Sequence, residues 1–467
     1  MGKGNAIEIV KRTLSRKALA YWDARLVTEA GTEFSTLEGQ VKKCVEARDS
    51  GVGVRVLYKD SWGFASTSVL GGKSVTAAAE KAFKMARAVH SSRHFPAALN
   101  ASEAVSGKAR ASGKLKCDAL SLEEKVKGVL ELSKFGRSLD EKVRVCDLAY
   151  SDHSIKSVFA NSEGAAIEQE CQRISLGIEP VAKANGKIQS FHEKIQRVGG
   201  LEEIFNGGEA RRKIEKAAGK SVELLEARLP RAGKYDLVID PDLGGVFAHE
   251  AVGHPCEGDS IIGHESLFEG RLGEKIAGEN VSITDNPLLD WRQNFGYYAF
   301  DDEGVKARKH ELVKKGVLSE FLLDRQSASR LGLEASGSAR AEGYSSPPIV
   351  RISNTYFEPG DWGLEELLEE ARNGFLLESS RGGQTDPITG TYQFNTQLTR
   401  EIKNGELGKS FLPTSFSGKL LETLHGIKGV GDKLEISSGY CGKGGQWVPV
   451  GDGSPYLLVS KGLIGGA

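Results

Sequence analysis

The first half of the chain mixes helical with strand-like spacing of hydrophobic residues. Ser74 is placed to cap a helix that runs to about His90, and apolar residues recur at helical spacing over 122–135. Strand-like alternation follows. We expect strands over 143–150, 154–159 and 173–180, with a hairpin turn at Asp152-His153 between the first two.

A charge-rich helical stretch over 201–227 ends this half, and the Pro- and Gly-containing segment 228–233 breaks its pattern. We therefore predict a boundary near residue 230. It divides the chain into a mixed α/β N-terminal domain, 1–230, and a C-terminal domain, 231–467.

The second half opens with a buried-type strand over 235–240, and a helix is predicted from about Pro241 into His249. Many short strand-like segments follow, separated by Gly, Asn and Asp turns. This order predicts an α+β fold, in which the C-terminal domain is mostly antiparallel β and carries one functionally important helix.

Composition and charge exclude several classes of protein. With 39% hydrophobic and 27% charged residues, the chain is typical of a soluble globular protein. Its net charge of -1 gives no bulk reason for direct nucleic-acid binding. No apolar run reaches the ~18 residues of a membrane span, and the N-terminus lacks the apolar core of a signal peptide. The six cysteines form no CxxC pair, so we expect reduced thiols and a cytoplasmic location.

The segment with the clearest chemistry is His249-Glu250-Ala251-Val252-Gly253-His254. The chain has only nine histidines, and two of them bracket a glutamate here. Imidazole nitrogens are good zinc ligands, and a glutamate beside the first ligand can act as general base toward the attacking water. The motif therefore predicts a metal site with His249 and His254 as ligands and Glu250 as the base.

The spacing of the two histidines requires a local distortion. In a regular helix, residues four apart lie about 40° apart around the axis, whereas residues five apart lie about 140° apart. A π-bulge would bring residues five apart to one face. Alternatively, the helix ends at Gly253, Pro255 enforces the break, and His254 folds back. With either local conformation, we predict that the helix is distorted over 252–254.

A catalytic zinc has a third protein ligand and an open position for water. Candidates for this ligand are Cys256, Glu257, Asp259, His264 and the distant Cys441. Glycines on both sides of Cys441 leave its backbone free to bring the sulfur close to another group. The spacing alone does not choose among these residues.

At this point several segments resemble one known family. Residues 249–259 resemble the HEAxGHxxEGD signature of TldD proteins. Further blocks follow in the family's order: 300–304 is similar to IDDEG, 351–356 to RMTNTY, 382–386 to GGQVD, 441–451 to CGKxGQxxPVG, and Gly465-Gly466 to its ending. The chain thus resembles the TldD/PmbA family from Asp240 onward, and more loosely before it. It keeps the histidine motif that the PmbA (TldE) branch lacks, and so resembles the catalytic branch.

The resemblance implies a two-domain α+β zinc peptidase. It implies that His249, His254 and Cys441 bind the zinc ion and that Glu250 is the catalytic base. It also implies degradation or maturation of unfolded or extended peptides in the cytoplasm. The expected assembly is a dimer, either with a metal-free PmbA/TldE-like paralogue or with itself.

Two further pairs of residues are candidates for substrate binding. Arg340 and Arg351 could hold a substrate carboxylate by bidentate pairing, or could form structural ion pairs. The sequence departs from the family at Ala341, where many members have a second arginine. Gly382 and Gly383 could bind an extended peptide through their backbone, as strand addition, or could form a plain turn.

A second class of function stays open on the sequence. The protein could be a non-enzymatic regulatory or assembly subunit with a structural metal site. A fourth protein ligand, such as Glu257 or Cys256, would then close the coordination shell.

Overall fold

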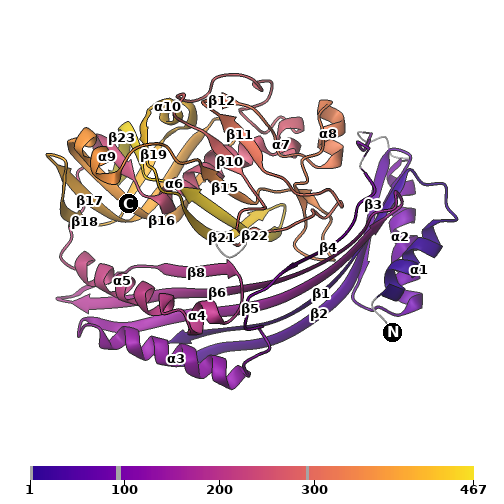
Figure 1. The fold of residues 1–467 in the computed structure, drawn as a ribbon, viewed down its shortest axis with the longest axis horizontal. Helices are drawn as coiled ribbons and strands as arrows, with labels where there is room; N and C mark the ends of the chain where they lie inside the picture. Colours follow the sequence, from indigo (N-terminus) through magenta and orange to yellow (C-terminus); the bar gives the residue numbers. More distant parts are fainter. Residues whose placement is uncertain (1–3, 91–95, 102, 291–293, 467) are drawn as a thin grey trace.

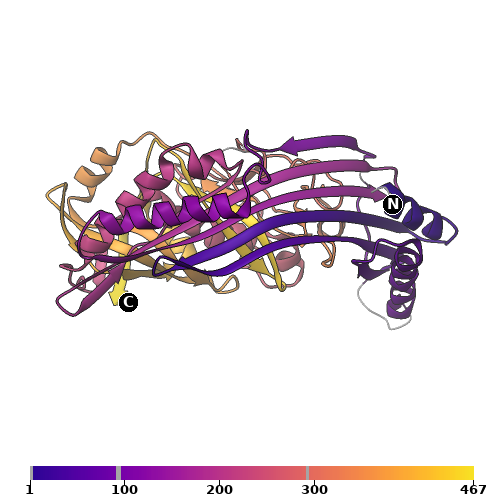
Figure 2. The same ribbon diagram turned by 90° about the horizontal axis from the view of Figure 1, so that it is seen from below.

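The N-terminal half of the computed structural model, which describes residues 4–90, 96–101, 103–290 and 294–466, is built on long antiparallel strands (Figures 1 and 2). The strands are β1 Tyr21–Leu37, β2 Gln40–Tyr58, β3 Ser61–Thr67, β4 Ser106–Ala111, β5 Val143–Asn161, β6 Ala166–Ala184, β7 Lys187–Ser190 and β8 Glu193–Val198. Their order is β3-β2-β1-β5-β6-β4, and β7 and β8 also pair with β6. Among the described strands of this half, β4 and β6 form the only parallel pair.

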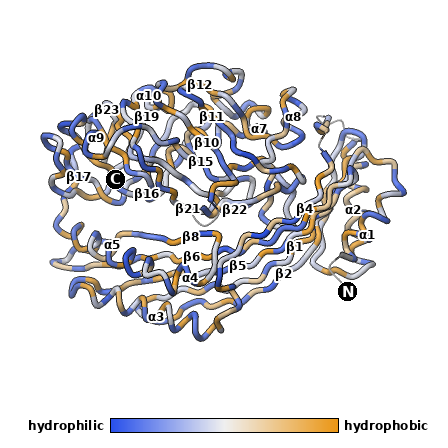
Figure 3. Tube along the Cα trace, viewed as in Figure 1, coloured by the Kyte–Doolittle hydropathy of each residue, from blue (hydrophilic) through white to orange (hydrophobic). Residues whose placement is uncertain are grey.

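Side-chain alternation gives this sheet two different faces. Even-numbered positions of the long strands β1, β2, β5 and β6, such as Val54, Leu148 and Leu176, are buried under helices. These helices are α1 Gly4–Leu14, α2 Gly72–His90, α3 Leu122–Ser138, α4 Glu202–Phe205 and α5 Glu209–Leu224. Odd-numbered positions, such as Arg55 and Arg173, face the C-terminal half. Hydrophobic and hydrophilic stretches accordingly alternate along the long strands (Figure 3).

The predicted helices over 74–90 and 122–135 are confirmed, although α2 begins at Gly72, so Ser74 lies inside its first turn and does not cap it. The predicted hairpin at Asp152-His153 is wrong. β5 runs through both residues because each polar side chain has a partner on its own face of the sheet. Asp152 forms a buried ion pair with Lys125 of α3 at 2.7 Å. On the opposite face, His153 Nδ1 lies 2.9 Å from Glu29 Oε1. The chain turns later, between β5 and β6.

The predicted helical stretch over 201–227 is present as two helices, α4 and α5. Gly207 and Gly208 separate them, and Gly208 has a φ of 68°, which a helix does not contain. The predicted domain boundary near residue 230 falls in the connection between α5 and β9 (Gly233–Ile239).

The C-terminal half contains two sheets and a short β13–β14 pair, Ala339–Arg340 with Ile349–Val350. The first sheet has the order β16-β9-β23-β19-β17-β18, and a β16–β17 pairing closes five of its strands into a ring. Its strands besides β9 are β16 Asn373–Thr385, β17 Thr391–Lys403, β18 Glu406–Phe411, β19 Thr414–Lys419, β20 Ile427–Val430 and β23 Leu457–Gly466.

The second sheet has the order β12-β11-β10-β15-β22-β21. Its strands are β10 Ile283–Asp285, β11 His310–Lys314, β12 Val317–Leu318, β15 Asn354–Phe357, β21 Glu435–Lys443 and β22 Gln446–Ser454. In this half, β15 pairs in parallel with β22 and β9 with β16, whereas the other ladders between its strands are antiparallel. The α+β prediction, with a mostly antiparallel second half, is therefore confirmed.

Helix α6, Pro241–Ala248, packs against both sheets of the C-terminal half. Its Phe247 is fully buried among the rings of Phe357, Tyr392 and Phe394. The other helices of this half are α7 Gly258–Ile262, α8 Arg325–Leu331, α9 Leu364–Ala371 and α10 Leu420–His425. No helix in the described part of the chain is long and apolar enough to cross a membrane.

The C-terminal half lies on the concave side of the long sheet (Figure 1). Buried ion pairs join the two halves. Arg55 of β2 contacts Asp23 of β1 and reaches Glu303 of the C-terminal half at 3.0 Å. Arg25 contacts Asp302 at 3.1 Å. These contacts fix the position of the C-terminal half against the sheet.

Candidate metal centre

Helix α6, which leads into the histidine motif, is fixed at its start and at its middle. The Asp240 side chain caps its start by accepting a hydrogen bond from Leu243 N at 3.0 Å, and Pro241 follows the cap. Gly245 lets the helix approach β22 closely, because a Cβ at this position would lie 2.7 Å from the Asp452 carbonyl carbon. The helix is thus fixed against the strand that contains Asp452.

A π-helical turn, His249–Gly253, follows α6 directly. The backbone N–H of His254 donates to the carbonyl of His249, which is an i→i+5 bond. A 3-10 turn, His254–Cys256, ends the segment. Of the two local structures compatible with the spacing, the π-bulge is therefore the one observed, and the predicted distortion is confirmed.

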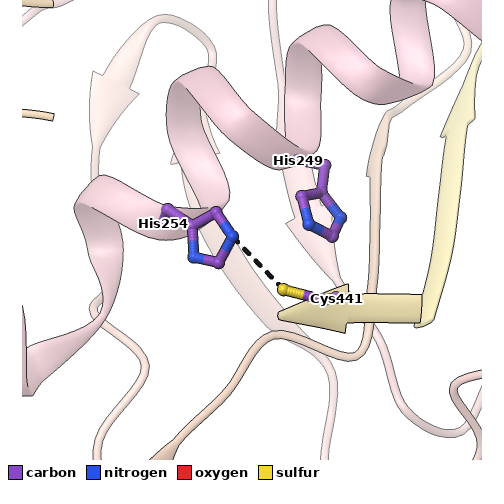
Figure 4. Close-up of side chains that lie close together, drawn as sticks. All are labelled: His249, His254 and Cys441. Carbon is purple, nitrogen blue, oxygen red and sulfur yellow. Dashed lines mark hydrogen bonds between the residues drawn. The ribbon is translucent and has the colours of Figure 1, made fainter. Parts of the chain in front are cut away.

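The two histidines meet Cys441 from β21 (Figure 4). One ligand atom from each of His249, His254 and Cys441 lies within 4.8 Å of the others. Cys441 Sγ is 3.3 Å from His254 Nε2. His249 and Cys441 are each 5% exposed, so the cluster is largely shielded from bulk water.

A carboxylate orients each imidazole ring. Asp452 Oδ1 lies 2.5 Å from His249 Nδ1, and Glu257 Oε2 lies 2.8 Å from His254 Nδ1. Because a carboxylate accepts the Nδ1 proton, the Nε2 atoms are left for the site. Lys443 holds Glu257 in turn, with Nζ 3.0 Å from the same Oε2 atom.

The charges around Cys441 favour a thiolate. Burial would raise the pKa of its thiol, but hydrogen bonds from His249 and His254 lower the pKa to about 5. Burial also lowers the pKa of His254, whereas the charge of Glu257 raises it to about 10. The thiolate and the carboxylates behind the rings concentrate negative charge. A divalent cation would be stabilised there in place of the ring protons, so the donor set fits a metal ion.

The other candidates for a third ligand lie elsewhere. Cys256 is fully buried outside the cluster, and the exposed His264 contacts Glu269 at 2.7 Å. Asp259 contacts Lys443 Nζ at 2.7 Å, and Glu257 stands behind His254. Among the residues that the structure describes, only His249, His254 and Cys441 form a group of this kind.

The cluster lines a cleft of about 490 Å³. Half-buried Glu250 lines the same cleft, and so do Gly382 and Gly383 of β16. The structure therefore brings together the predicted metal ligands, the predicted base and the two glycines predicted to bind a peptide through their backbone. A larger cleft of about 1120 Å³, lined mainly by residues of β17, β19 and β23, contains none of these residues.

Arg340 and Arg351 do not line this cleft. The Arg340 guanidinium donates to the carbonyls of Ile352 and Pro449 at 2.8 and 2.7 Å. Arg351 is fully buried and donates to the carbonyls of Cys441 and Gln446 at 2.6 and 3.1 Å. These bonds give both arginines a structural role near β21 and β22. Their contact with a substrate carboxylate stays a prediction, without geometric support.

The sequence analysis missed Asp452 and the aromatic residues Tyr440 and Trp447, which also line the cleft. One signal could have found Asp452. It follows Val448 and Val450 at strand alternation, so it shares their buried face. The pairing of Cys441 with Val448 could not be read from spacing.

Comparison with known proteins identifies relatives over most of the chain. The C-terminal domain of the PmbA/TldA metallopeptidases matches residues 232–466, the central domain matches 115–226, and domain 1 matches 22–86. A protein of Methanothermobacter thermautotrophicus named metalloprotease is 38% identical over 446 residues, which cover 96% of this chain and 95% of the relative.

More distant relatives agree with this match. A Saccharolobus solfataricus protein named zinc metalloprotease TldD homolog is 28% identical over 426 residues, or 90% of each chain. The crystal structure of TldE from Thermococcus kodakarensis has the same fold, with a TM-score of 0.79 and 19% identity over 99% of each chain. The His/His/Cys group and the metalloprotease names both indicate a metal. The chain belongs to the TldD/PmbA family of metallopeptidases.

Proposed function

We propose that this protein is a zinc-dependent peptidase that hydrolyses unfolded or extended peptides, for degradation or for peptide maturation. The supporting observation is the convergence of His249, His254 and Cys441 on one side of a cleft that Glu250 also lines. Two histidines and a cysteine form a ligand set that suits zinc and leaves one position open. The name of the Saccharolobus relative includes zinc.

The three side chains would hold zinc through the two Nε2 atoms and the sulfur. When bound, zinc would supply a Lewis acid that polarises a peptide carbonyl and makes water more acidic. Asp452 and Glu257 keep the imidazole rings in one tautomer and orientation. Lys443 restrains Glu257 further and is itself held by Asp259, so this part of the site is organised before substrate arrives.

Glu250 is the proposed general base. It follows a ligand directly and lines the cleft, and no described residue donates a hydrogen bond to its carboxylate. The carboxylate would accept a proton from the attacking water and pass it to the leaving amine. We expect Glu250→Gln to keep its zinc and fold but to lose at least ~10²-fold in peptide hydrolysis. Glu279→Gln, on an exposed turn, is the matched control.

Metal analysis and peptide hydrolysis are measured on the same preparations of these variants. Normal turnover by Glu250→Gln would remove this residue as the base. Loss of zinc from the variant would instead give Glu250 a part in metal binding.

The backbone of β16 is the proposed docking edge for an extended peptide. β9 pairs only with residues 374–377 of β16, so beyond them the edge opposite β17 has no strand partner among the described residues. Gly382 and Gly383 lie on this stretch, are exposed, and line the cleft. A peptide added there as a strand would bring its carbonyls beside the metal centre.

The alternative is a regulatory or assembly subunit with a structural metal. A structural zinc has four protein ligands, whereas only three gather in the described part of the chain. This count supports the catalytic proposal. One zinc per chain, together with no hydrolysis of any unfolded peptide by the protein or by its mixture with a paralogue, would favour the alternative.

We also propose a dimer in the cytoplasm, formed with a metal-free PmbA/TldE-like paralogue or with a second copy. A second subunit would enclose the cleft and exclude bulk water from the metal centre. The location is proposed because the six cysteines form no CxxC pair and the sequence has no signal-peptide pattern. Light scattering with and without a co-expressed paralogue tests the assembly, and a fully active monomer would contradict it.

A further inference from the structure

The hairpin of β21 and β22 presents a second chemical surface beside the metal centre. Cys441 pairs with Val448 and Gly442 pairs with Trp447. Because successive residues of a strand point to opposite faces, Cys441 and Val448 share the buried face. Tyr440, Gly442 and Trp447 share the other face, where the aromatic side chains are 45% and 58% exposed.

Gly442 allows the Trp447 ring to lie flat on this face. A Cβ at Gly442 would lie 3.1 Å from Trp447 Cη2 and 3.2 Å from Cζ2 and Cζ3. The indole therefore covers the glycine that follows the cysteine ligand. Its other side is open to solvent, since more than half of its surface is exposed.

Tyr440 lies diagonally across the hairpin from Trp447, because Tyr440 pairs with Pro449. Its ring is held edge-on against buried Phe295, with the ring centroids 5.2 Å apart. One fixed aromatic ring and one open aromatic ring thus flank Gly442. Both residues line the same cleft of about 490 Å³ as His249, His254 and Glu250.

We propose that Trp447, supported by Tyr440, forms an apolar subsite that selects peptides with an aromatic or large aliphatic side chain near the bond to be cut. This inference rests on the proposed peptidase function and names a specificity determinant within it. When another apolar group covers the open face of an exposed indole, the burial of apolar surface makes binding more favourable. A peptide docked on β16 would carry its side chains past this hairpin.

The position of Trp447 in the same cleft as the metal ligands favours a substrate side chain over a partner subunit as its occupant. A partner would have to enter the cleft that the substrate needs. Oligomeric state nevertheless belongs in the test, because an exposed tryptophan is also common at subunit contacts.

The first measurement is hydrolysis of two unstructured Gly/Ser-rich peptides that differ only by one central Phe or Ser. We expect the zinc-loaded protein to favour the Phe peptide in kcat/KM by about 10-fold or more, as apolar pockets do. Trp447→Ala should remove most of this preference through KM, and Trp447→Phe should keep much of it. Leu407→Ala, at an exposed apolar residue of β18, should leave the preference unchanged.

The second measurement is binding without turnover. Fluorescein-labelled versions of both peptides are titrated into Glu250→Gln and into Glu250→Gln/Trp447→Ala, and fluorescence anisotropy gives Kd. The added substitution should weaken binding of the Phe peptide about 10-fold and change the Ser peptide little. Gly442→Ala, which displaces the ring without removing it, should give an intermediate loss once its zinc content is shown to be normal.

Three outcomes would overturn the subsite. These are an equal loss for both peptides, an unchanged preference in Trp447→Ala, and a change from dimer to monomer that accounts for the loss. If the wild-type protein cuts neither peptide, the proposed function fails. The binding titrations then still decide whether Trp447 recognises apolar side chains.

Discussion

At the scale of single residues, the metal centre depends on side chains that stand behind the ligands. Asp452 contacts His249, and Glu257 contacts His254, each through Nδ1. Neither carboxylate belongs to the group of three ligand atoms. Their contribution is to fix the ring orientation and to make the imidazole a stronger ligand.

Asp452→Asn tests this contribution with little change in shape. We expect zinc affinity to fall by about 10- to 100-fold, because an amide cannot accept the Nδ1 proton as strongly as a carboxylate. Competition with a chromophoric chelator measures the affinity, and circular dichroism checks the fold. Asp361→Asn, at an exposed aspartate, is the control. Wild-type affinity in Asp452→Asn would show that the hydrogen bond does not tune the ligand.

The two buried cysteines nearest the motif should behave differently. Cys441→Ser should abolish stoichiometric zinc, because it removes the only thiolate in the cluster. Cys256→Ser should keep one zinc per chain, since its side chain is buried outside the cluster. Mass spectrometry of the purified proteins gives the metal content. The reverse result would move the third ligand to Cys256.

At the scale of elements, the sequence predicted the distortion at the histidine motif because helix geometry is local. Two ligands that are five positions apart cannot share one face of a regular helix, and the π-helical turn follows from that constraint. Likewise, the helical spacing of apolar residues was enough to predict α3, and the structure adds Ser121 as its N-cap. Constraints within one or two turns can be read from neighbouring residues alone.

Long-range pairing could not be read in this way. Asp152-His153 has the composition of a turn, yet it lies inside β5 because α3 and β1 supply partners on the two faces. Spacing also left five candidates for the third ligand. The choice of Cys441 came from resemblance. Its geometry depends on contacts between residues distant in sequence, since Cys441 Sγ meets His254 Nε2 and β22 pairs with β15. The contacts of Arg351 with two backbone carbonyls have no signal in the sequence.

The ladder between β16 and β17 has a register shift between Ser380 and Gly383, and this irregularity gives a prediction at the scale of elements. A Cβ on Gly383 would lie 2.4 Å from Gln393 O, so Gly383→Ala must shift β16 against β17, at about 1–3 kcal/mol. Gly382→Ala meets no atom within 4 Å and is strained only by its φ of 82°, at roughly 1 kcal/mol. Gly383→Ala should therefore lower the midpoint temperature of thermal unfolding more than Gly382→Ala does. The rate of peptide hydrolysis should fall in the same order. Equal effects would mean that β16 accommodates the added carbon without moving.

At the scale of the whole molecule, the two halves are joined by buried charge. Arg55 neutralises both Asp23 and Glu303, and all three residues are less than 9% exposed. Arg55→Ala would leave two buried carboxylates without their cation, which typically costs about 3–5 kcal/mol. Denaturant unfolding should show this loss of stability, and limited proteolysis should show faster cleavage near residue 230.

An exposed ion pair supplies the control for Arg55. Arg308 pairs with Glu320 at 2.9 Å, and both side chains are substantially solvated. Arg308→Ala should change stability by less than about 1 kcal/mol. If Arg55→Ala changes stability as little as Arg308→Ala does, the two halves are held together by apolar contacts rather than by the buried ion pairs of Arg55.

The position of the cleft also limits which substrates can be cut. The β21–β22 hairpin lies on the side of the C-terminal half that faces the long sheet (Figure 1), and the ligands line a cleft of about 490 Å³, so a substrate must enter this cleft to reach them. An extended chain can do so by adding to the edge of β16 beyond residue 377, which has no strand partner among the described residues. A folded protein must first unfold locally, at a cost of several kcal/mol. We therefore expect a reduced and alkylated protein to be cut at least ~10²-fold faster than its native form, since ~3 kcal/mol of local unfolding corresponds to that factor. Electrophoresis of parallel digests, with Glu250→Gln as the blank for contaminating proteases, gives the two rates. Equal cleavage of both forms would show that the metal centre is accessible to folded proteins. That result would not affect the proposed zinc ligands.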